Sequence, residues 1–206
     1  MSETDLVADL KASLQDAATV FFAGPDADFK RHLAVAALDF ARIRPRTLVG
    51  SLTLVADQSE YAELPADFYL FKSSLWGVSP APAARPWDTN WHGRLPDVFQ
   101  VETGGVAGLS VRPAPTAAQI AALGATFRYY YAARHAIHES DGAQTTIRAG
   151  DRGLLILRAQ AEAMRELTFR NIFKPVQVLQ GMSSTPRNGT PAALFRALIE
   201  EFEAAA

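Results

Sequence analysis

The sequence contains no cysteine, and this absence excludes several kinds of site at once. Disulfides, thiolate nucleophiles and cysteine metal ligands are all impossible without it. Apolar residues make up 49% of the chain, yet no apolar run approaches the roughly 18 residues that a membrane-spanning helix needs. The polar, acidic start also lacks the basic and apolar regions of a signal peptide. We therefore expect assembly in a cytoplasm and no membrane partner.

An excess of positive charge is missing as well. The 20 lysines and arginines are outnumbered by 22 acidic residues, which gives a net charge of −2. Tight nucleic-acid binding depends on basic side chains that neutralise phosphates. The overall balance therefore disfavours a DNA-binding protein, although it permits a protein that surrounds DNA without gripping it.

Sequence motifs for nucleotide or hydrolytic chemistry do not occur. There is no G-x-x-x-x-G-K-[ST] phosphate loop, no G-x-G-x-x-G after a strand and no G-x-S-x-G elbow. Pairs of carboxylates could meet across the fold, but 22 acidic residues offer many pairs, and spacing alone selects none. We predict no catalytic residue, no cofactor and no enzyme activity; a hydrolase with scattered carboxylates is a rival without a motif.

Two histidines form a pattern that could bind a metal. His135 and His138 are three residues apart, with Glu139 and Asp141 just beyond them. On a helix the two imidazoles would share a face. The segment instead follows a predicted strand, where positions three apart point to opposite faces, and it leads into Gly142. We expect a surface loop and no metal site.

Helical periodicity marks both ends of the chain. Apolar residues recur three and four positions apart, the spacing that lines one face of a helix. Gly24-Pro25 separates the first two helices, and Thr190-Pro191 has the cap-then-proline pattern of a helix start. Helices are expected over 4–19, from Asp26 or Asp28 to Phe40, over 153–169 and over 190–202.

Shorter segments in the middle of the chain alternate or are rich in aromatic residues, as strands are. Gly104-Gly105 separates two of them, which is a hairpin signal. Residues 116–123 read as a turn or a brief helix, 176–179 as an apolar segment of uncertain type, and 181–189 as a flexible linker. Strands are expected over 51–55, 67–78, 98–101, 109–111 and 127–131.

These patterns predict an α+β fold with two parts. Residues 1–48 and 148–206 are expected to form a helical bundle that ends in a docking helix. Residues 49–147 are expected to form an inserted β-rich module, a small antiparallel sandwich or barrel.

Three surface features are candidate contact sites. Arg42, Arg44 and Arg46 gather around a proline, as a solvated junction or as a contact with nucleic-acid backbone or an acidic partner. Trp87 and Trp91 lie in a proline-rich loop, where either the module itself or a partner subunit must cover them. The terminal helix docks on its own domain or in a groove of another protein. Its apolar face comprises Leu194, Phe195, Leu198 and Phe202.

Two segments of the middle region together resemble a known family. An L-P-x-D-[FY] strand start is followed by a long polar excursion, then L-x-V-x-P-x-P, then a tyrosine-rich strand. The order is similar to that of the head-to-tail adaptor (connector) proteins of tailed bacteriophages. The matching residues are Leu64, Pro65, Asp67, Phe68, Leu109, Val111, Pro113, Pro115, Tyr129, Tyr130 and Tyr131.

The resemblance implies a structural protein of the virion neck. It implies a homo-oligomeric ring, a dodecamer, between portal and tail, with DNA passing through its channel. The partners would be portal, tail and neck proteins, and assembly would occur in the cytoplasm of the host bacterium. Trp87 and Trp91 would contact partners in the ring, and the C-terminal helix would reach the portal.

Two alternatives stay open. Another phage neck or tail-completion protein would share these features. A ligand- or carbohydrate-binding module is also possible, because Trp76, Trp87, Trp91 and the tyrosines at 129–131 could form an aromatic platform.

Overall fold

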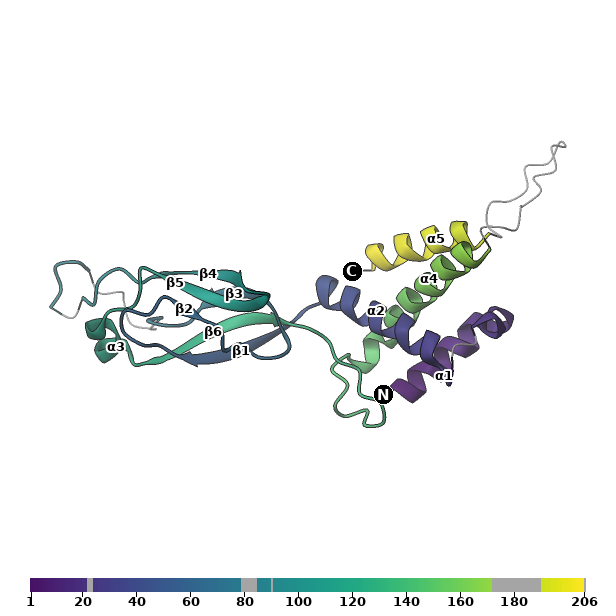
Figure 1. Ribbon diagram of the computed structural model, residues 1–206, viewed down its shortest axis with the longest axis horizontal. Helices are drawn as coiled ribbons and strands as arrows, with labels where there is room; N and C mark the ends of the chain where they lie inside the picture. Colours follow the sequence, from purple (N-terminus) through teal and green to yellow (C-terminus); the bar gives the residue numbers. More distant parts are fainter. Residues whose placement is uncertain (22–23, 79–84, 90, 172–189, 206) are drawn as a thin grey trace, which may run out of the picture. The chain divides into compact units, whose positions relative to one another are not determined.

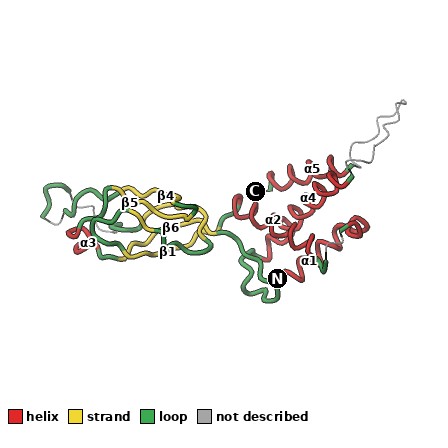
Figure 2. The backbone as a smooth tube through the Cα atoms, viewed as in Figure 1, coloured by secondary structure: helices red, strands yellow, loops and turns green. Residues whose placement is uncertain are grey.

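The computed structural model describes residues 1–21, 24–78, 85–89, 91–171 and 190–205. Within these ranges the protein combines helices with two antiparallel sheets, which is an α+β fold (Figure 1, Figure 2). Its contacts divide the chain into two compact parts: a helical unit, Met1–Arg44 with His135–Ala206, and a β unit, Pro45–Arg134. The segment expected at 176–179 and the linker expected at 181–189 lie outside the described residues.

Helices from both ends of the chain build the helical unit. The long helix α4 contacts each of the other three major helices (Figure 1). These elements are α1 (Glu3–Leu14) with the 3-10 turn η1 (Gln15–Val20), α2 (Ala27–Ile43), η2 (Ala149–Asp151), α4 (Arg152–Arg170) and α5 (Pro191–Ala204).

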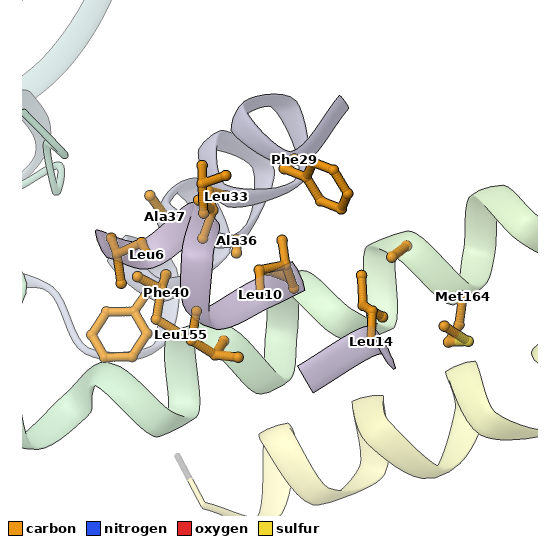
Figure 3. Close-up of a cluster of buried hydrophobic side chains, with 14 of the residues drawn as sticks. Leu6, Leu10, Leu14, Phe29, Leu33, Ala36, Ala37, Phe40, Leu155 and Met164 are labelled. Atoms are coloured by element: carbon orange, nitrogen blue, oxygen red, sulfur yellow. The ribbon is translucent and has the colours of Figure 1, made fainter. Parts of the chain in front are cut away.

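Apolar residues at helical spacing form the core of this unit. Leu6, Leu10 and Leu14 lie along one side of α1 and pack with Phe40 of α2 and Leu155 of α4 (Figure 3). Leu6, Leu10 and Leu155 are completely buried. Each such side chain contributes about 1.5–3 kcal/mol by leaving water. The predicted amphipathic stripes are therefore the surfaces that hold the helices together.

Local hydrogen bonds set the limits of α1. The Ser2 hydroxyl accepts from the Asp5 N–H (3.2 Å), and the Asp5 carboxylate accepts from the Ser2 N–H (2.9 Å), which is a capping box. The helix ends at Leu14 because Gln15 has a φ of 50°, outside the helical region. The continuous helix expected over 4–19 is therefore an α-helix followed by a 3-10 turn.

The segment 135–147 belongs to the helical unit, although the sequence grouped it with the strands. The Glu3 N–H donates to the His138 carbonyl (2.9 Å), which ties the segment to the start of α1. Ile147 is 4% exposed and lies in the helical core. Contacts formed after the last strand thus place the observed boundaries at 44/45 and 134/135 instead of 48/49 and 147/148.

Two three-stranded antiparallel sheets make up the β unit. The first has the order β1 (Arg46–Thr53), β6 (Thr126–Ala133), β3 (Phe68–Ser74). The second has the order β2 (Glu60–Tyr61), β5 (Val106–Arg112), β4 (Asp97–Thr103). The hairpin between β4 and β5 turns at Gly104 and Gly105, whose φ angles of 63° and 80° suit glycine. A capped short helix, α3 (Ala117–Leu123), precedes β6.

Both sheets bury side chains in one aromatic cluster. Phe127, Tyr129 and Tyr131 alternate along β6 and point into it, while Leu109 and Val111 enter it from β5. This alternation is what the period of a strand requires when one face is buried. β1 starts at Arg46, earlier than expected, because it pairs with β6 along its whole length, from Arg46 opposite Ala133 to Thr53 opposite Thr126.

One side chain connects the edges of the two sheets. The Gln100 amide on β4 donates to the Tyr69 carbonyl (3.3 Å) and accepts from the Phe71 N–H (3.0 Å) on β3. A side-chain amide therefore occupies backbone groups that a further strand would otherwise bind.

Candidate interaction surfaces

The loop around Trp87 exposes two tryptophans. Trp87 is 75% exposed and Trp91 43%. Asp88 shapes this loop, because its carboxylate accepts from the Arg85 N–H (2.7 Å) and its carbonyl accepts from the Trp91 N–H (3.1 Å). The Arg85 guanidinium lies 5.7 Å from the Trp87 ring centre. Both indoles are therefore accessible to a partner, as the partner interpretation requires.

Three of the six aromatics of the ligand-binding alternative are closed to a ligand, whereas Trp87, Trp91 and Tyr130 are exposed. Trp76, Tyr129 and Tyr131 are each at most 4% exposed and lie in the aromatic cluster. The Trp76 indole N–H donates to the Gly124 carbonyl (2.9 Å), and the Tyr131 hydroxyl donates to the Asp67 carboxylate (3.0 Å). Burial and this hydrogen bond raise the pKa of Tyr131 to about 12. These aromatics are structural, because they are closed to solvent.

The three arginines of the predicted cluster have different surroundings. Arg44 donates to the Asp151 carboxylate (2.9 Å) and to the Ala205 carbonyl, so it joins the end of α2 to η2 and the end of α5. Arg46 belongs to the β unit and lies 4.0 Å from the Asp67 carboxylate. Arg42 is exposed and forms no ion pair with any described residue. Of the three, Arg44 already has a structural role.

The C-terminal helix α5 docks on its own unit. Thr190 caps it and Pro191 occupies its first turn, as predicted. Phe202 is 2% exposed, and Phe195 and Leu198 pack against the helical core. Leu194 is 42% exposed. Of the four residues expected to contact a partner, Leu194 therefore lies at the surface while the others fix the helix to α4.

An ionic cluster that the sequence gave no reason to expect connects α2 to α4. Glu166 accepts hydrogen bonds from His32 (2.8 Å), Arg31 and Arg170. Burial works against the charged carboxylate, but these hydrogen bonds outweigh it and lower the pKa of Glu166 to about 2. Asp28, itself 2% exposed, accepts from Arg170 (2.9 Å). The cluster connects the two helices, and removal of one member would leave a buried charge without its partner.

The histidine pair of the predicted loop bonds to protein groups. The His135 ring lies within 3.0 Å of the Arg44 carbonyl and packs edge-on against Phe40. The His138 ring accepts from the Asp141 N–H (2.9 Å). Among the described residues, no group of three His, Asp or Glu side chains is placed to hold a metal. These histidines order the loop.

Three hollows on the described surface, each of about 280–310 Å³, do not gather catalytic groups. Their linings include Trp76, Tyr61 and Ala37, respectively. Each contains at most one carboxylate or histidine, whereas acid–base catalysis needs such groups to converge. In the described part of the chain, no helix combines the length and apolar character needed to cross a membrane.

The exposed tryptophans are candidate contacts for another macromolecule. A comparison with family models identifies the class: the family model described as "SU10 adaptor protein" matches residues 1–182 of the chain. The chain belongs to this family of phage head-to-tail adaptors and is a structural component of the virion. No curated protein matches the chain. The match spans the β unit and α1 to α4 and ends before α5.

Proposed function

We propose that this protein forms a ring in the phage neck, between the portal and the tail, and that DNA passes through the channel of the ring. The observation that carries the proposal is the family match across both units. The separate aromatic and helical cores support a two-domain organisation, a β-sandwich inserted into a helical bundle. The ring would be a dodecamer that assembles in the host cytoplasm with portal and tail proteins.

Trp87 and Trp91 are the proposed contacts between neighbouring subunits. Exposed tryptophans favour association because a partner can remove a large apolar ring from water. Alanine replacement of a central interface aromatic costs about 2 kcal/mol or more, a loss of about 30-fold in affinity. Phe99 on β4, which is 53% exposed, offers a control for loss of an exposed aromatic.

The C-terminal helix is the proposed portal contact, through its exposed side at Leu194. Phe195, Leu198 and Phe202 would hold the helix on α4 while Leu194 meets the portal. Arg42 is the proposed contact with channel DNA or an acidic partner, because Arg44 is held by Asp151.

The test is to follow the tagged protein in lysates during particle production and in purified particles. The wild type should co-purify with portal and tail proteins and appear as rings by electron microscopy. Replacing Trp87 and Trp91 by alanine should abolish rings, whereas Phe99→Ala should retain them. Absence from purified particles would refute the neck assignment.

A second pair of variants separates contact from folding in α5. Leu194→Asp should weaken portal co-purification by about tenfold or more without lowering the melting temperature, since the side chain is already exposed. Phe202→Ala should lower the melting temperature, because it opens a cavity that costs about 3–5 kcal/mol. Equal portal binding by the wild type and Leu194→Asp would remove α5 as the contact.

A further inference from the structure

The sheet β1–β6–β3 has one face in the aromatic cluster and one face toward solvent. Burial alternates along β6: Phe127 and Tyr129 are buried, whereas the next residue after each, Arg128 and Tyr130, is exposed. Strand alternation continues this second face along β1. On β3 two register shifts interrupt the alternation, and Leu70 and Ser73 lie opposite Ala132 and Tyr130 of this face. We call it the polar sheet face; it comprises Thr47, Val49, Ser51, Thr53, Leu70, Lys72, Ser73, Thr126, Arg128 and Tyr130. The exposed Arg134 follows directly after the end of β6.

Lys72 lies across this face. Its ammonium group donates to the Thr47 hydroxyl (2.6 Å), although β6 separates the two strands that carry them. Ala132, the residue opposite Thr47 on β6, is 1% exposed, as expected if the lysine stem covers it. The positive charge therefore lies beside Thr47 on the edge strand β1.

The polar sheet face lacks negative charge. None of the three strands contains an aspartate or glutamate, in a chain that has 22 acidic residues. Most lysines and arginines elsewhere in the described ranges pair with carboxylates, as Arg31, Arg44 and Arg152 do. Lys72, Arg128 and Arg134 form no such pair with a described residue. Two uncompensated cations, Lys72 and Arg128, therefore lie on the polar sheet face, and a third, Arg134, lies just beyond the end of β6.

Hydroxyl groups surround these cations. Five exposed serines and threonines and the 39% exposed Tyr130 accompany Lys72, Arg128 and Arg134. Arginine, lysine, serine, threonine and tyrosine side chains are the usual donors to nucleic-acid phosphates. Interfaces between proteins, in contrast, are depleted in lysine and serine. The face also exposes Val49 on β1 and Leu70 on β3, but its charged and hydroxyl groups favour nucleic acid over an acidic protein surface.

We propose that the polar sheet face binds the phosphodiester backbone of nucleic acid. Its eight-residue strands, β1 and β6, extend about 26 Å, a length that covers about seven phosphates of one DNA strand. This proposal rests on the proposed role of the protein as a DNA channel. It assigns the main phosphate contact to the sheet instead of to the arginines at 42–46.

Three phosphate contacts imply weak binding that depends steeply on salt. Each neutralised phosphate contributes about −0.9 to the slope of log affinity against log salt, so the expected slope is about −2.7. Affinity should fall about 40-fold between about 50 and 200 mM salt. Binding of this strength would allow DNA to slide past.

The experiment titrates a fluorescently labelled DNA duplex with the full chain and measures anisotropy over this salt range. Replacing Lys72 and Arg128 by glutamine should weaken binding at least tenfold at low salt and reduce the slope to about −0.9. The control replaces Arg94 and Arg112, which are exposed in the same unit but lie outside the polar sheet face. Replacing these two arginines by glutamine removes the same charge, and it should leave the affinity at low salt and the salt slope unchanged.

Three outcomes would overturn the proposal: no binding at low salt, an equal loss in the control, or competition by polyglutamate as effective as that by unlabelled DNA. The last would assign the face to an acidic protein. Arg128→Lys keeps the charge and should keep the salt slope, which guards against misfolding as the cause. Ring formation by the glutamine variant is followed separately, so failure of DNA binding and failure of the adaptor role are distinguishable.

Discussion

At the scale of single residues, Tyr129 is enclosed on all sides in the core of the β unit. It is completely buried, and rings of Phe127 and Tyr131 lie within 6 Å of its own, centre to centre. Its hydroxyl has no hydrogen-bond partner among the described residues, and burial raises its pKa. An unpaired buried hydroxyl lowers stability, because it leaves water without compensation.

Tyr129→Phe should therefore stabilise the protein by about 1 kcal/mol. Gly50→Ala should have the opposite effect and cost about 1–3 kcal/mol, since an added methyl carbon would lie 2.5 Å from the Tyr129 ring. Urea unfolding followed by near-ultraviolet circular dichroism measures both changes. A less stable Tyr129→Phe variant would mean that the hydroxyl is bonded.

The lowered pKa of Glu166 predicts that the helical unit loses stability in acid. Its pKa is lowered from 4.5 to about 2, so the folded state favours the charged form. The resulting stability is present above pH 4.5 and is lost as the pH falls toward 2. The melting temperature of the wild type should decline in this window, and that of Glu166→Gln should start lower and decline less. Parallel curves for the two proteins would refute the assignment.

At the scale of elements, regular segments could be predicted from sequence because their signals are local. Gly104-Gly105 marks a turn, and Thr190-Pro191 marks a helix start, through conformations that neighbouring residues alone decide. The transition in α1 at Gln15 was not predicted, because the apolar spacing continues past the residue where the backbone changes.

Contacts between distant elements could not be predicted in this way. His32 and Glu166 are 134 positions apart, and no local pattern relates them. The same holds for Arg44 with Asp151: the sequence indicated a solvated junction or a partner contact, and it gave no sign of this bond between the end of α2 and η2. The exposed tryptophans, in contrast, were predictable as candidates, because a proline-rich loop offers little cover.

The hydrogen bonds from Gln100 on β4 to the backbone of β3 can be tested by substitution. Gln100→Ala leaves the Phe71 N–H and the Tyr69 carbonyl without their present partner. We expect a loss of about 1 kcal/mol and faster hydrogen exchange at the Phe71 amide. Glu102→Ala, two residues along the same strand, serves as the control and should leave that amide unchanged. Equal exchange of the Phe71 amide in all three proteins would show that the contact between β3 and β4 does not depend on Gln100.

At the scale of the whole molecule, each unit has its own core. A fragment of residues 45–134 should therefore fold alone, with the near-ultraviolet signal of packed aromatics and a cooperative thermal transition. A fragment that lacks both would show that the β unit requires the helices. The near-ultraviolet signal would come from Trp76 and Tyr129, which are both buried in the aromatic cluster of the β unit.

The β unit leaves and rejoins the helical unit through neighbouring strands. Arg46 of β1 lies opposite Ala133 of β6, so the two chain crossings are adjacent backbone segments of an antiparallel pair. A pull on the β unit would load both strands together, in the same direction. Neither strand would be peeled from the other, since their ladder of hydrogen bonds bears no opposing force. The connection behaves mechanically as a double-stranded tether.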